Sequence, residues 1–305
     1  KNSRFSHTVE IKSIKDDTYI TPKNISIKLM SKDTINGKTL KVFIPYIRLE
    51  IPLFIMFRVL GIETDKEIVE YIVNDFNEDN IDIMNWLKPS ILDASNIRNQ
   101  EDAFNYISKG MTILGQPKDI KLDKKKKHEY IINMLNRDFL TQMDNDFKKK
   151  ALFLGYMVNK LAKCYFGKIK YDDRDSYCNK RIETSGNLMA GLFRQYFTKL
   201  VKDMRNSIMK ELNSGPWKTK KNIEEIVNAT NLYKIFKSTT IEAGLKYGLA
   251  TGNWGVKSTT SKVGIAQVLS RLTYNSTLSH LRRVNTPTEK TGKLVPPRKL
   301  HNTQW

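Results

Sequence analysis

Cysteine is scarce in this chain of 305 residues, which contains only Cys164 and Cys178. Two cysteines are too few for a disulfide framework, and they do not make a zinc quartet. Cys164 falls on the apolar face of a predicted helix, so we expect it to belong to a core. The sequence is therefore typical of a protein from a reducing, intracellular compartment.

Long uninterrupted apolar runs are also missing. Residues 43–62 form the most apolar stretch, but two prolines and three charged residues interrupt it, namely Pro45, Arg48, Glu50, Pro52 and Arg58. Such a run does not predict a membrane span. No signal-peptide pattern is visible at the start of the sequence. We therefore expect no membrane among the partners.

Acidic residues are few beside the basic ones. The chain has 32 Asp and Glu against 52 Lys and Arg, which gives a net charge of +20 and a pI of about 9.7. A surplus of this size points to a polyanion, with nucleic acid as the first choice and an anionic membrane as the second. The run Lys124–Lys127 is more typical of a solvated loop than of a binding site. With 40% hydrophobic residues, the length suffices for two or three domains.

The first half of the chain mixes strand and helix patterns. Alternation with a period of two predicts strands near residues 8–14, 25–29 and 40–45, with a hairpin turn at Asn36-Gly37. Residues 51–61 predict a short buried helix closed by a glycine, and residues 65–76 an amphipathic helix. Short helices and turns should fill residues 81–116, and two further helices residues 128–143 and 147–166. In the last of these the expected apolar stripe is Leu152, Tyr156, Val158, Leu161, Ala162 and Tyr165.

The second half begins with the longest predicted helix, at residues 187–213. Its apolar stripe consists of Leu188, Leu192, Phe193, Tyr196, Phe197, Leu200, Met204 and Ile208. The basic side chains off this stripe are Lys199, Lys202, Arg205 and Lys210. They would form either a face that contacts nucleic acid or a partner subunit, or an ordinary solvated face, which is the commoner case. Residues 222–236 predict another helix. Gly244–Gly255 is glycine-rich around Trp254, which favours sharp turns and close backbone approach.

Two short patterns raise the question of metal or nucleotide binding. Asp172, Asp173 and Asp175 are clustered, but a solvated acidic turn explains them better than a metal site. Gly255-Val-Lys-Ser-Thr superficially resembles a phosphate-binding loop, yet its lysine has the wrong spacing and no apolar strand precedes it. A nucleotide-binding enzyme is therefore the weakest of the hypotheses.

The residues that follow are basic and polar. Residues 257–305 contain nine Lys or Arg and one acidic residue, Glu289. Residues 263–286 predict a helix, a break and a second short helix, with Val263, Ala266, Val268 and Leu269 facing a core. The stretch also holds hydroxyl, amide and imidazole groups beside three guanidinium groups: Gln267, Ser270, Thr273, Ser276, Thr277, Ser279, His280, Arg271, Arg282 and Arg283. This mixture suits a channel lined by phosphates.

This stretch resembles the fork region of the second-largest subunit of multisubunit DNA-dependent RNA polymerase. Five residues fall on matching positions of the bacterial relatives without a gap: Gln267, Ser276, His280, Arg282 and Arg283. Ser270 and Val268 stand where the bacterial pattern has an acidic and an aromatic residue, so rifamycin sensitivity is not expected. The archaeal, eukaryotic and viral versions are similar over nearly the whole chain, including residues 45–61, 171–181 and 244–255.

The resemblance implies an α+β, multi-domain fragment. Residues 1–172 correspond to the lobe domain, residues 173–250 to the C-terminal half of the protrusion domain, and residues 251–305 to the fork region. The fork loops would lie near residues 256–262 and 287–297. The chain begins at Lys1 and ends at Trp305, and we expect it to be part of a longer subunit.

The resemblance also implies roles for individual residues. Arg271, Arg282 and Arg283 would contact backbone phosphates or brace the fork, and Gln267 and His280 would lie near the nucleotide-addition centre. Downstream DNA or the displaced strand would meet Lys290, Lys293, Arg298 and Lys299. One arginine of the pair 282–283 could instead form an internal salt bridge, and Gln267 and His280 could be satisfied polar groups of a core.

The family's Mg²⁺ ions are held by the largest subunit, so no catalytic residue, cofactor or metal site is expected in this chain. The chain alone should be inactive as a nucleotidyltransferase. The implied partners are the largest subunit, the other polymerase subunits, the DNA template and the nascent RNA. The likeness is greatest to polymerase II and to versions from large DNA viruses, which places the protein in the nucleus or in a cytoplasmic virus factory. The alternative is a basic nucleic-acid-binding scaffold or adaptor outside a polymerase.

Overall fold

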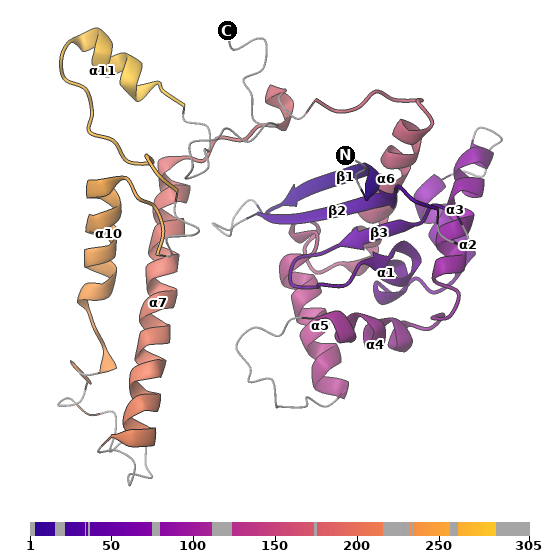
Figure 1. Ribbon diagram of the computed structural model, residues 1–305, viewed down its shortest axis with the longest axis horizontal. Helices are drawn as coiled ribbons and strands as arrows, with labels where there is room; N and C mark the ends of the chain where they lie inside the picture. Colours follow the sequence, from indigo (N-terminus) through magenta and orange to yellow (C-terminus); the bar gives the residue numbers. More distant parts are fainter. Residues whose placement is uncertain are drawn as a thin grey trace. The chain divides into compact units, whose positions relative to one another are not determined.

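The computed structural model of the chain describes residues 4–15, 22–33, 35, 37–74, 80–111, 124–173, 176–215, 228, 232–233, 235–256 and 262–284. Helices and one antiparallel sheet occur together, so the predicted α+β class is confirmed. The chain divides into two compact units, Lys1–Tyr171 and Asp172–Trp305 (Figure 1). Each unit is described by itself.

The sheet of the first unit has four strands in the order β1-β2-β3-β4, and all neighbours are antiparallel. The strands are β1 (Phe5–Ser13), β2 (Lys23–Met30), β3 (Leu40–Phe43) and β4 (Ile51–Pro52). Alternate side chains of β2 and β3 are fully or almost fully buried, as the period-two pattern predicted, namely Ile25, Ile27, Leu29, Leu40 and Val42. The three predicted strands are therefore confirmed.

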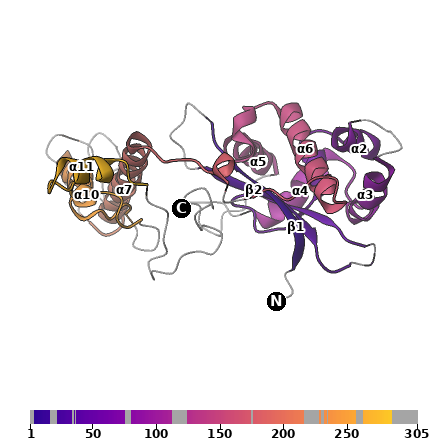
Figure 2. The same cartoon turned by 90° about the horizontal axis from the view of Figure 1, so that it is seen from above.

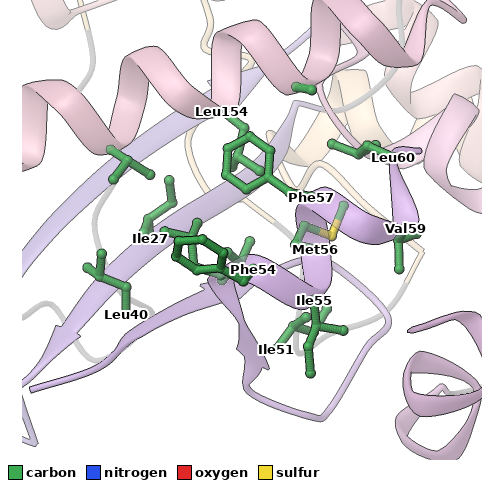
Figure 3. Close-up of a cluster of buried hydrophobic side chains, with 14 of the residues drawn as sticks. Ile27, Leu40, Ile51, Phe54, Ile55, Met56, Phe57, Val59, Leu60 and Leu154 are labelled. Atoms are coloured by element: carbon green, nitrogen blue, oxygen red, sulfur yellow. The ribbon is translucent and has the colours of Figure 1, made fainter. Parts of the chain in front are cut away.

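Helices cover this sheet. They are α1 (Leu53–Val59), α2 (Asp65–Val73), α3 (Ile81–Asp93), α4 (Gln100–Gly110), α5 (Lys124–Asp138), the 3₁₀ turn η2 (Thr141–Met143) and α6 (Phe147–Tyr165). Figure 2 shows α5 and α6 beside β1 and β2. The short helix α1 lies wholly inside, as predicted, and its Phe54 and Phe57 lie among Ile27, Leu40 and Leu154 (Figure 3).

One part of the helix pattern was wrong. Leu152 and Tyr156 of α6 were predicted to face the core, but their exposed fractions are 52% and 58%. The buried face of α6 runs instead through Ala151, Leu154 and Val158. Gly155 sets this orientation, because a Cβ atom at that position would lie 2.2 Å from the Tyr71 carbonyl oxygen of α2.

Three buried charges of the first unit are paired with polar groups. The guanidinium of Arg58 donates to the Ala94 carbonyl at 2.7 Å and pairs with Asp65. The buried amine of Lys150 donates to the Leu135 carbonyl at 2.7 Å, and burial lowers its pKa to about 8. Asp138 lies between Lys23 and Arg137. Such partners are required, because an unpaired buried charge is very costly.

The elements described in the second unit are η3 (Tyr177–Asn179), α7 (Ser185–Ser214), α10 (Thr239–Thr251) and α11 (Tyr274–Leu281). The long predicted helix is thus confirmed as α7, while most of the predicted helix 222–236 lies outside the described residues. Among the residues described in this unit, the main buried cluster consists of Leu192, Tyr196 and Trp254. Phe193 and Phe197, which the pattern placed on the apolar stripe, are 48% and 50% exposed.

Glycines let α10 approach α7 closely. A Cβ atom at Gly244 would lie 2.2 Å from the ring of Tyr196, and one at Gly248 would lie 2.9 Å from Leu192. Gly252 then ends α10 in the left-handed region, at a φ of +70°. The glycine spacing seen in the sequence therefore serves helix packing and a turn. Among the described helices of either unit, none is long and apolar enough to cross a membrane.

Substituting Gly244→Ala should loosen the second unit. The added methyl group would collide with Tyr196, and overpacking of this kind costs about 1–3 kcal/mol in free energy of unfolding. Hydrogen exchange of the α10 amides measures the effect. The matched control is Gly191→Ala in α7, where nothing lies within 4 Å of the new Cβ; this change should stabilise the helix by about 0.5–1 kcal/mol. Equal exchange in the two variants would contradict the packing described.

Candidate nucleic-acid interface

Only part of the predicted helix, break and second helix of residues 263–286 is confirmed. The first helix is absent, since residues 263–273 are bends and extended chain, whereas the second short helix is present as α11. Gly264 adopts a φ of +73°, and the amide of Ile265 donates to the Gly252 carbonyl at 3.2 Å instead of entering a helix. Val263 and Val268, predicted to face a core, are 63% and 92% exposed. Ala266 does pack against the Trp254 cluster.

The segment is joined to the rest of its unit at Trp254. The backbones of Trp254 and Lys262 exchange two hydrogen bonds of 2.7 and 2.9 Å, and Lys262 also pairs with Glu183. The indole N–H of Trp254 donates to the Leu188 carbonyl of α7 at 2.8 Å. These contacts fix the start of residues 262–284 against the α7–α10 pair. The interior of the predicted first fork loop, residues 257–261, lies outside the described residues.

A capping box starts α11. The Thr273 hydroxyl accepts a hydrogen bond from the Ser276 amide, and the Ser276 hydroxyl accepts one from the Thr273 amide, each at 3.1 Å. Two backbone donors that a helix start leaves open are thus satisfied. The spacing Thr-x-x-Ser is the sequence signal that predicts this arrangement.

His280 ties α11 to the extended residues before it. Its Nδ1 accepts a hydrogen bond from the Ser270 amide at 3.0 Å, so the ring proton resides on Nε2. Nε2 then donates to the Gln267 side-chain oxygen at 3.0 Å, and the Gln267 amide nitrogen donates to the Gly264 carbonyl at 3.1 Å. The Thr277 hydroxyl adds a 2.7 Å bond to the Ser270 carbonyl. The backbone turn is therefore held by side chains.

The structure brings Gln267 and His280 together, but their polar atoms bind each other and the backbone. Both groups are thus satisfied, as the alternative held, but they do not belong to a core, because His280 is only partly buried and Gln267 is exposed. Ser276 and Thr277 are likewise occupied locally. Their placement near a nucleotide-addition centre stays a prediction.

The arginines differ from these residues. Arg271, Arg282 and Arg283 are exposed, and no hydrogen bond or ion pair involves their side chains within the part of the chain that is described. Arg282 and Arg283 line a shallow, open hollow with Leu278 and Ser279. No acidic residue occurs between Glu242 and Glu289 in the sequence. A carboxylate partner for these arginines cannot come from this stretch.

Large apolar side chains are exposed beside the arginines. Val268, Leu272 and Tyr274 are about 90% exposed, at 92%, 89% and 92%, and α11 has no buried residue. The sequence pattern had suggested a partly buried segment. The surface of residues 262–284 is therefore both cationic and apolar, as is common where a further macromolecule covers a site.

The remaining predicted contacts fall outside the described residues. They are Lys290, Lys293, Arg298 and Lys299, together with the second fork loop near residues 287–297. Across the described ranges no three side chains of His, Cys, Asp or Glu gather as they would around a metal ion. Asp172 and Asp173 are exposed, while Asp175 is not described.

Comparison with known proteins identifies the family. The family model for "RNA polymerase Rpb2, domain 2" matches residues 8–183, which is more than half of the chain. The model for "RNA polymerase Rpb2, domain 3" matches residues 267–305 and so includes most of the candidate interface. The chain belongs to the Rpb2 family of RNA polymerase subunits.

Curated relatives agree with this over nearly the full chain. The chain is 39% identical to DNA-directed RNA polymerase II subunit RPB2 of Eremothecium gossypii, over 99% of the chain and 24% of that protein. It is 37% identical to the polymerase II subunit 2 of Arabidopsis thaliana, over 99% of the chain and 24% of that protein. A mimivirus polymerase subunit 2 is 31% identical, over 97% of the chain and 25% of that protein. The chain thus spans about a quarter of the length of these Rpb2 relatives.

Within this Rpb2 segment, Thr277→Val should loosen α11 from the residues before it. The change keeps the side-chain shape but removes the hydroxyl that binds the Ser270 carbonyl, at a cost of about 1 kcal/mol. We expect faster hydrogen exchange at the amides of residues 270–280. Thr277→Ser retains the hydroxyl and serves as the control. Equal exchange in both variants would show that the hydroxyl does not hold the segment.

Proposed function

We propose that this chain acts within a multisubunit DNA-directed RNA polymerase, where residues 262–284 hold nucleic-acid phosphates beside the active centre. The observation that carries this proposal is a contrast within the segment. The side chains of Gln267, Thr277 and His280 are hydrogen-bonded inside it, whereas Arg271, Arg282 and Arg283 are exposed and have no partner among the described residues. The family membership supports the setting in a polymerase.

Arginines suit phosphate binding, and the other polar residues suit support of the backbone, for a physical reason. Guanidinium groups present fixed, paired donors that match the oxygens of a phosphate. Such donors are most effective on a backbone that is already rigid, because less ordering remains to be done on binding. The internal hydrogen bonds of Gln267, Ser270 and His280 supply that rigidity. The hydroxyls are thus supports of the site, rather than the neutral phosphate donors that composition alone had suggested.

The contribution of the chain is positional. Phosphoryl transfer by polymerases needs Mg²⁺ ions and the carboxylates that bind them. The described residues do not offer such a donor set, so the metal ions do not fit here. We therefore propose that the largest subunit holds the metal ions and that this chain alone is inactive. Its further partners would be the other subunits, the DNA template and the nascent RNA, in the nucleus or in a virus factory.

The proposal is tested with the complete polymerase carrying Arg282→Ala and Arg283→Ala. Assembly and elongation are scored separately on a defined nucleic-acid scaffold. We expect normal assembly, scaffold affinity lowered at least about tenfold, and a slope of log affinity against log salt that is smaller by about two units.

Two comparisons sharpen this test. The pair Arg282→Lys and Arg283→Lys keeps the charge and should keep the salt slope while losing the paired donors. The pair Lys125→Ala and Lys126→Ala removes two exposed cations from α5 and should change neither assembly nor elongation. Loss of assembly in the arginine variant would make these residues structural braces, and unchanged activity in both assays would refute their role.

A further inference from the structure

Five aromatic rings from three distant parts of the first unit lie in one cluster. His7 belongs to β1, Trp86 to α3, Tyr165 to the last turn of α6, and Phe166 and Tyr171 to the chain that follows it. None of these residues belongs to the main buried core, although Trp86 and Tyr165 pack against it. The cluster belongs to the first unit, whereas residues 262–284 belong to the second.

The rings form a continuous series of stacked and edge-on contacts. Trp86 stacks on Tyr165 at a centroid distance of 5.6 Å, and Tyr165 meets His7 edge-on at 5.2 Å. His7 stacks on Tyr171 at 5.9 Å with an interplanar angle of 22°. Phe166 meets both Tyr165 and Trp86 edge-on, at 5.3 and 6.3 Å. Each inner ring is therefore braced by its neighbours.

Two rings of this cluster, Phe166 and Tyr171, are open to solvent. Tyr171 is 73% exposed and Phe166 is 37% exposed. Tyr171 is nevertheless held in place, because its hydroxyl and His7 Nε2 are 3.0 Å apart and hydrogen-bonded. An exposed ring fixed in this way presents a preorganised aromatic face, and burying it against a partner costs little conformational entropy.

The chain around the exposed rings is strongly cationic. Residues 147–171 contain seven lysines and no acidic residue. Lys163 and Lys170 flank the pair Tyr165-Phe166 and Tyr171, and neither amine has a partner within the described part of the chain. Asp172 and Asp173 follow immediately in the sequence, so the run of positive charge ends at Tyr171.

We propose that this surface, defined by Phe166, Tyr171, Lys163 and Lys170, binds unpaired bases of a single nucleic-acid strand. The ring faces of unpaired bases are open and stack on aromatic side chains whatever their sequence, while nearby lysines attract the backbone phosphates. A duplex covers its base faces by stacking, so it gains only the charge attraction. The site goes beyond the phosphate contacts proposed above and lies in the other unit of the chain.

The test measures binding of fluorescent oligothymidylate to the complete 305-residue chain by anisotropy. Tyr171→Ala should lower the affinity for this single strand about tenfold, since stacking contributes about 1–3 kcal/mol per base. The same variant should bind an abasic strand of equal length and charge as the parent does. Tyr171→Phe keeps the ring but loses the bond to His7, and it should recover most of the affinity.

Two further variants separate this site from other effects. Tyr156→Ala removes another exposed ring, which lies on α6 outside the cluster and is 58% exposed, and should leave binding unchanged. The pair Arg282→Ala and Arg283→Ala should lower the affinity for the oligothymidylate and for the abasic strand alike. The role proposed for residues 262–284 is therefore tested separately from the role of Tyr171. The inference is overturned when Tyr171→Ala matches Tyr156→Ala, weakens both strands equally, or is not rescued by Tyr171→Phe.

Discussion

The hydrogen bond from the Ser270 amide to His280 Nδ1 is the contact on which the candidate interface depends. It fixes the tautomer of His280, which in turn orders Gln267 and through it the Gly264 carbonyl. No apolar core replaces this link, because α11 buries no residue. The shape of residues 262–284 is thus set by a few side-chain hydrogen bonds, each of modest net strength. Arginines carried on such a segment are held in place while remaining accessible.

The two units are stabilised in different ways. The first buries a large cluster of aliphatic and aromatic side chains between its sheet and helices, as Figure 3 shows in part. The second closes α7 on α10 through glycines and, among its described residues, buries Leu192, Tyr196 and Trp254 in its main cluster. The second unit also exposes large apolar side chains, among them Phe193 and Phe197. The chain spans only a quarter of the length of its relatives.

Much of the fold could be predicted from the sequence, and the failures share a cause. Period-two alternation located β1, β2 and β3, and helical spacing located α1, α6 and α7, because each buries one regular face. The same spacing misled at Val263 and Val268, where a left-handed Gly264 and tertiary hydrogen bonds overrode it. Composition identified a basic, polar segment, but it could not show that Gln267 and His280 bind each other. Nor could the sequence show that the side chains of Arg282 and Arg283 are exposed, because exposure depends on how the chain folds around them.

The most direct test of the fork account is a cross-link from position 283 in a transcribing polymerase. A photoreactive amino acid replaces Arg283 in the complete enzyme, which is halted on a scaffold with labelled DNA and RNA and then irradiated. The account predicts that label from the nucleic acid becomes attached to this subunit, and that the same probe at Tyr156, an exposed position of α6, gives none. Cross-links to protein alone from position 283 would contradict it.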